Sequence, residues 1–105
     1  MSAMTWSETR RRQAVLRQVR AVAAERQDGM LPWIDDYADA FSGPDDLLRD
    51  LAYFWRIHVE AQVDTNLSEA EMEERWDALN VAYPGVQQII DAHRVADRRE
   101  HELAA

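Results

Sequence analysis

Residues 44–63 constrain the fold more than any other segment, because apolar side chains cover most of the circumference of the helix that they predict. At 100° per residue the segment leaves only a narrow polar strip that includes Arg49 and Arg56. The apolar arc consists of Leu47, Leu48, Leu51, Phe54, Trp55, His58, Val59 and Ala61. A helix that is apolar over so wide an arc must be covered on more than one side, so it predicts a helical domain packed around it.

Capping signals divide the rest of the chain into further helices. Thr5 and Glu8, and again Ser68 and Glu71, have the spacing of a capping box, in which hydroxyl and carboxylate accept hydrogen bonds from free amides at a helix start. Pro84-Gly85 marks a turn. The sequence therefore predicts an all-α, single-domain bundle spanning 1–105, with disordered ends at 1–4 and 103–105. Its main helices are expected at about 6–27, 44–63, 69–82 and 85–102, with a short helix at about 32–41.

The faces of these helices are unequal. In the first helix Val15, Leu16, Val19, Val22 and Ala23 share one side, and the arginines lie opposite or at its edge. In the third main helix the i, i+4, i+7, i+11 spacing predicts one buried seam of Met72, Trp76, Leu79 and Tyr83. The apolar stripe of the last helix ends at His93, so the charged residues 94–102 are expected to fray, to project, or to meet a second chain.

Charge is distributed unevenly along the chain. The net charge is −8, every positive residue is arginine, and cysteine is absent, which excludes disulfides, thiolate metal sites and cysteine nucleophiles. Residues 1–26 carry six arginines and two acids, whereas 27–74 carry 13 acids and two arginines. No stretch has the length and apolarity of a membrane span or a signal peptide. A cytoplasmic protein without a membrane partner is expected.

Two interpretations of this asymmetry remain open. Arg10, Arg17 and Arg20 could form a basic face that contacts nucleic-acid phosphate, but the acidic middle of the chain would repel a duplex. The favoured alternative is that the first helix docks on acids, in its own chain or in a second one. The candidate acidic face consists of Asp35, Asp36, Asp39, Asp45 and Asp46. A nucleic-acid partner is therefore not expected.

Histidines and tryptophans supply the candidate sites. His93, Asp97 and His101 follow one another at four-residue spacing and could hold a divalent metal, although three ligands over two turns of one helix converge poorly on one ion. A titrating surface cluster is favoured there, and no cofactor is expected. A candidate ligand pocket consists of His58, Trp33, Trp55 and Trp76. The competing interpretation is that these residues are core or interface anchors.

Several short stretches resemble a group of short, uncharacterised helical proteins of high-GC Gram-positive bacteria. The similar stretches are 6–12, the helix entry at 45–49 before Trp55, and Trp76 with the turn at 83–86. They are helix caps and anchors. The resemblance implies a bacterial, cytosolic origin and carries no activity or functional residue with it.

No catalytic motif is present in the sequence, so the favoured function is a non-catalytic protein–protein interaction or regulatory module. The wide apolar arc, four tryptophans and segregated charge favour a self-associating protein, with a homo-oligomer or another protein as partner. The alternatives are a bundle that binds a small molecule or metal, and a protein that contacts nucleic-acid phosphates through the arginines of the first helix.

Overall fold

The computed structural model describes residues 5–63 and 66–104, and the side chains at 101, 103 and 104 lie outside this description. Four α-helices and one 3-10 helix make up the described part, which contains no strand. They are α1 (Trp6–Arg26), η1 (Asp35–Asp39), α2 (Pro44–Gln62), α3 (Glu69–Ala82) and α4 (Val86–Ala104). The predicted all-α fold with four main helices is confirmed. The expected disorder at 1–4 and 103–105 stays a prediction.

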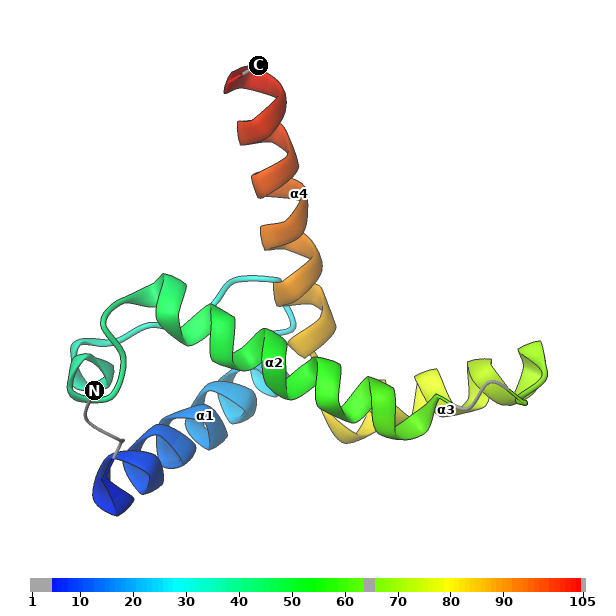
Figure 1. Ribbon diagram of the computed structural model, residues 1–105, viewed down its shortest axis with the longest axis horizontal. Helices are drawn as coiled ribbons and strands as arrows, with labels where there is room; N and C mark the ends of the chain where they lie inside the picture. The colour runs from blue at the N-terminus through cyan, green and yellow to red at the C-terminus, as the bar shows by residue number, and fades with distance from the viewer. Residues whose placement is uncertain (1–4, 64–65, 105) are drawn as a thin grey trace.

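Helix α2 lies at the centre of the molecule, and the other helices are arranged around it (Figure 1). Helices α3 and α4 both contact α2, and α4 also contacts α1. The C-terminal half of α4 and the end of α3 that is distant from α4 extend away from this centre (Figure 1). None of the helices in the described residues combines the length and apolarity that crossing a membrane requires.

One buried cluster joins all of these elements. This cluster includes much of the apolar arc of α2, as the sequence predicts. The arc is buried because α1 covers one side of α2, and α3 and α4 cover another. The buried side chains are Val15, Val19, Ala23, Tyr37, Phe41, Leu47, Leu51, Trp55, Leu79, Val86, Ile89 and Ile90. Leu48 and Val59 pack against this cluster, whereas Ala61 is exposed because it lies beyond the covered part of α2.

The predicted buried seam of α3 is only half present. Leu79 is buried and Tyr83 is half-buried, but Met72 and Trp76 are each 37% exposed. The prediction was wrong for these two residues because α3 reaches the core only through its C-terminal half. Its earlier turns lie along the far end of α2 and have no second helix over them (Figure 1).

The short helix is also shorter than the range 32–41. Only Asp35–Asp39 is helical, in the 3-10 form, and Ile34 before it is extended with φ −134° and ψ 159°. Pro32 is buried and Trp33 packs edge-on against Tyr37, with ring centroids 5.9 Å apart. The apolar contacts of this segment with the rest of the protein therefore favour an extended backbone before the 3-10 helix over one continuous helix.

Both predicted capping boxes are formed. Thr5 Oγ1 accepts a hydrogen bond from the Glu8 amide at 3.1 Å, and the Glu8 carboxylate accepts from the Thr5 amide at 3.1 Å. Ser68 and Glu71 make the same reciprocal pair at 3.3 and 3.0 Å. These bonds satisfy amides that the first turn of a helix leaves without partners, so the starts of α1 and α3 are set by local sequence.

Helix α1 docks on acids of its own chain, as the favoured interpretation of the charge pattern predicts. Arg11 Nε lies 3.0 Å from Asp39, and Arg12 Nη2 lies 3.4 Å from Asp46 and 3.0 Å from Asp50. The Arg12 guanidinium also stacks over the Phe41 ring at 4.4 Å. These contacts join α1 to η1 and to the first half of α2.

Asp46 additionally caps the start of α2. Its carboxylate accepts a hydrogen bond from the Ser42 amide at 3.0 Å, whereas the N-cap residue Gly43 makes no side-chain bond. This hydrogen bond, with a further contribution from Arg12, lowers the pKa of Asp46 although partial burial opposes the shift. Because the folded state holds the ionised form, the stabilisation is complete above the ordinary carboxyl pKa of about 4 and is lost as pH falls through the lowered folded-state pKa.

We therefore expect Asp46→Asn to lower the free energy of unfolding by about 1 kcal/mol at neutral pH, because the charge at the helix start and beside Arg12 is removed. The difference from the unsubstituted protein should shrink as the pH falls toward about 2. Urea denaturation followed by circular dichroism at several pH values measures it. Asp45→Asn is the control, because Asp45 is exposed in the same first turn. An equal cost for both substitutions, or a difference that persists in acid, would contradict this role of Asp46.

Gly85 permits the close crossing of α1 by the start of α4. Its φ of +84° lies in the left-handed region, and a Cβ atom built there would collide with the backbone carbonyl of Ala23. A side chain at this position would therefore strain the turn and push the two helices apart. The turn between α3 and α4 that the sequence predicts at Pro84-Gly85 thus also sets how closely α4 approaches α1.

Gly85→Ala should lower the free energy of unfolding by about 2–4 kcal/mol, from the positive φ and from the collision with α1 together. Gly43→Ala is the matched control. Its backbone is extended, with φ 172°, and no atom lies within 4 Å of the position of the added Cβ, so its cost should stay below about 1 kcal/mol. Thermal or urea denaturation measures both. A neutral Gly85→Ala would contradict the close helix crossing.

Candidate functional site

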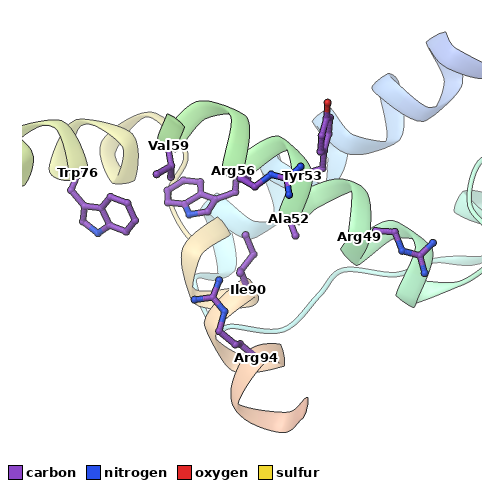
Figure 2. Close-up of a pocket in the computed structure, with 9 residues that line it drawn as sticks. Arg49, Ala52, Tyr53, Arg56, Val59, Trp76, Ile90 and Arg94 are labelled. Carbon is purple, nitrogen blue, oxygen red and sulfur yellow. The ribbon is translucent and has the colours of Figure 1, made fainter. Parts of the chain in front are cut away.

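A groove of about 520 Å³ lies between α2, α3 and α4 (Figure 2). It is called the α2–α3–α4 groove below. Its lining comes mostly from one side of α2, with one residue from α3 and two from α4. The lining residues are Arg49, Ala52, Tyr53, Trp55, Arg56, Val59, Trp76, Ile90 and Arg94.

Two tryptophans form the apolar floor of this groove. The rings of Trp55 and Trp76 meet edge to face, with centroids 6.0 Å apart and an interplanar angle of 76°. Trp55 is only 6% exposed and belongs to the core, whereas Trp76 is 37% exposed because α3 is uncovered at this point. Ala52, Val59 and Ile90 complete the apolar surface. A partner that covers Trp76 would bury further aromatic area on a support that is already packed.

Three arginines surround the apolar floor, and no acid is among the lining residues. Figure 2 shows Arg94 on the α4 side and Arg49 farther along α2. The nearest acids of Arg49, Arg56 and Arg94 are on their own helices, at 3.8, 3.9 and 3.9 Å. Their side chains are 78%, 65% and 64% exposed, so these long pairs are weak and leave the guanidinium groups open to another anion. The groove is thus positively charged on a protein of net charge −8.

The four residues of the predicted ligand pocket do not share one site. Trp55 and Trp76 meet in the α2–α3–α4 groove, but Trp33 packs on Tyr37 beside η1. His58 faces a different groove, between α1 and α2, where its ring lies 4.1 Å from the Phe54 ring centroid and 5.1 Å from that of Tyr83. His58 and Trp55 lie on the same helix but line different grooves, which the sequence pattern of α2 alone does not reveal.

Both histidines with described side chains are anchored to their own helices. His58 Nδ1 lies 2.8 Å from the Phe54 carbonyl, and His93 Nδ1 lies 2.8 Å from the Ile89 carbonyl. Because a carbonyl oxygen only accepts, Nδ1 donates in each case, and Nε2 is left for other partners. Each of these half-buried imidazoles is thus satisfied at one nitrogen by the backbone of its own helix.

The candidate metal cluster is only partly described. His93 and Asp97 line one shallow hollow against α2, whereas the side chain of His101 lies outside the described residues. Within the described side chains, no group of three or more His, Asp or Glu residues is placed to hold a metal ion. A metal site that includes His101 stays a prediction.

The three arginines of the candidate basic face have different surroundings. The Arg10 guanidinium lies over the Trp6 ring at 5.4 Å, Arg17 is exposed, and Arg20 is half-buried over the Phe54 ring at 4.3 Å. Arg20 therefore belongs to the α1–α2 groove. On the candidate acidic face, Asp39 and Asp46 are engaged by arginines of α1, and Asp35, Asp36 and Asp45 have exposed side chains.

Sequence reasoning missed the arginines of the α2–α3–α4 groove. Arg49 and Arg56 were recognised only as part of the polar strip of α2, although their seven-residue separation places them on one side of the helix. Nothing in the local sequence of α4 indicates that Arg94 joins them, because this depends on how α4 crosses α2. The sequence feature that could have indicated this groove is the pair of arginines on the same helix as Trp55.

Comparison with protein-family models, with curated proteins and with solved structures found no match to this chain.

The two groove tryptophans should respond differently to truncation. Trp55→Ala should cost about 3–5 kcal/mol of stability, because it removes a buried core side chain. Trp76→Ala should cost about 1 kcal/mol or less, because much of this ring already contacts water. Urea denaturation followed by circular dichroism measures both. Equal costs would show that α3 is packed more completely than the exposed fraction of Trp76 indicates.

Proposed function

We propose that this protein is a non-catalytic interaction module that self-associates through the α2–α3–α4 groove. The observation that carries the proposal is the combination of an apolar, tryptophan-based floor with three weakly paired arginines on an otherwise acidic protein. Apolar area at the centre with charge around it is the usual arrangement of a protein interface. A second copy of the chain is the proposed partner.

The acidic first turns of α3 supply the complementary charge. Glu69, Met72, Glu73 and Trp76 follow the i, i+3, i+4, i+7 spacing and therefore share one side of α3. All four are exposed. This side of α3 is thus acidic and partly apolar, and it adjoins the groove to which Trp76 contributes.

The adjacency of these two surfaces favours a two-fold symmetric dimer. In such a dimer each copy uses the same patch, so the patch must contain both halves of every complementary pair. Here the arginines of one copy would face the acids of α3 in the other, and Met72 with Trp76 would be covered. The long intrachain pairs of Arg56 and Arg94 would be replaced by contacts that exclude more water.

Other uses of the charged residues have less support. Arg11 and Arg12 are paired with acids of the same chain, and Arg20 is half-buried, so three of the six arginines of α1 are already engaged by the body of the protein. This favours protein association over nucleic-acid binding for the chain as a whole.

The test is the oligomeric state of the untagged protein, measured by sedimentation equilibrium over a range of concentrations. We expect a monomer–dimer equilibrium that weakens as salt is added, because interfacial charges are screened. The double substitution Arg56→Glu with Arg94→Glu should weaken association by about a hundredfold, because it places like charges opposite each other. Circular dichroism checks that the variant remains folded.

The matched control is Arg17→Glu with Arg98→Glu. It changes the net charge by the same amount at two exposed positions that do not line the groove. A second variant with Glu69→Arg and Glu73→Arg should restore association when mixed with the Arg56→Glu, Arg94→Glu protein. A protein that stays monomeric at all concentrations, or a control that disrupts association equally, would overturn the proposal.

A further inference from the structure

A second groove lies between α1 and α2 and shares one lining residue, Tyr53, with the α2–α3–α4 groove. Its volume is about 390 Å³, and it is called the α1–α2 groove here. Three residues come from α1 and five from α2. The lining residues are Gln13, Leu16, Arg20, Asp50, Tyr53, Phe54, Ile57 and His58.

Arg20 is the unusual member of this lining. Its guanidinium is stacked over the Phe54 ring at 4.3 Å and is half-buried. Every other arginine of α1 that reaches the body, namely Arg11 and Arg12, is paired with an acid. For Arg20 no hydrogen bond or ion pair is found among the residues that the structure describes. A guanidinium has five N–H donors, so a partly dehydrated one without an acceptor is ready to bind an anion.

The electrostatic surroundings of Arg20 are consistent with this. Burial lowers the pKa of Arg20, the nearby Tyr83 raises it, and the neighbouring Arg17 lowers it. An arginine remains charged at neutral pH despite such a shift. The cost of holding this charge in a half-buried position would be offset by a bound anion.

Asp50 is the one acid in the groove lining, and it is already occupied. Its carboxylate lies 3.0 Å from Arg12 Nη2, which also lies 3.4 Å from Asp46. His58 adds a ring wall whose Nδ1 is committed to the Phe54 carbonyl at 2.8 Å. The positive charge available to a ligand in this groove is therefore that of Arg20, and the Gln13 amide, the Tyr53 hydroxyl and His58 Nε2 are further polar groups of the lining residues.

The rest of the surface is apolar or aromatic. Leu16 and Phe54 are half-buried, and Ile57 is 43% exposed. A ligand that fits must therefore combine one anionic group with an apolar body. A highly charged phosphate compound would leave this apolar wall uncovered and would place further negative charge near Asp50.

We propose that the α1–α2 groove binds a small organic monocarboxylate, with the carboxylate on the Arg20 guanidinium and an apolar or aromatic body on Leu16, Phe54 and Ile57. Planar carboxylates match the fork of a guanidinium in two parallel hydrogen bonds. The Phe54 ring, 4.3 Å from the guanidinium carbon, helps to hold this group at the groove. This inference does not depend on the proposed self-association.

The test uses phenylacetate as the carboxylate probe and phenylacetamide as its neutral counterpart, each titrated into the unsubstituted protein labelled with ¹⁵N. We expect saturable amide shifts around the α1–α2 groove with phenylacetate, and binding at least about tenfold weaker with phenylacetamide. This comparison needs no variant, so a folding defect cannot obscure it. Equal binding of the two probes, or no saturable binding of phenylacetate, would overturn the proposal.

Variants then locate the site. Arg20→Gln should weaken phenylacetate binding about tenfold or more, whereas Arg17→Gln, an exposed arginine one turn away on α1, should leave it unchanged. Arg56→Gln tests the other arginine-lined groove and should also leave binding unchanged. Loss of binding in Arg56→Gln with retention in Arg20→Gln would assign the carboxylate to the α2–α3–α4 groove and overturn this proposal.

Discussion

The burial of α2 is the constraint on which the rest of the structure depends. Its apolar arc is too wide for one neighbour, so α1 must cover one side while α3 and α4 cover another. The close crossing of α4 and α1 at Gly85 brings the helices on the two sides of α2 into contact. Because the outer helices pack mainly on α2, they leave gaps between one another. The two grooves lie along α2 at these gaps.

Arginine has three different roles around this centre. Arg11 and Arg12 pair with acids and fasten α1 to η1 and α2. Arg20 lies over the aromatic ring of Phe54 instead of beside an acid. It is half-buried and has no hydrogen-bond acceptor among the described residues. The arginines beside Trp76 are exposed and only weakly paired. The first group contributes to the fold, and the other two are the groups that the proposed binding events would use.

The proposed functions follow from places where packing is incomplete. Trp76 lies on a part of α3 that packs against α2 on one side and is exposed on the other. The buried ring of Trp55 lies beneath it. The α1–α2 groove exists because its apolar lining is only partly covered: Leu16 and Phe54 are half-buried, and Ile57 is 43% exposed. Both surfaces combine exposed apolar area with an arginine that has no close acidic partner within the chain. This combination is typical of a binding surface.

The sequence by itself determined the helical class, the capping boxes at Thr5 and Ser68, and the apolar arc of α2, because hydrogen bonds and periodicity within a few residues decide these features. It also indicated that α1 would dock on acids. Only the tertiary structure decided that Trp76 is exposed, that Trp33 and His58 do not line the groove of Trp55, and that Arg94 joins Arg49 and Arg56. These outcomes depend on crossing angles between helices, which are fixed by contacts between residues far apart in the chain and leave no periodic signal in either helix.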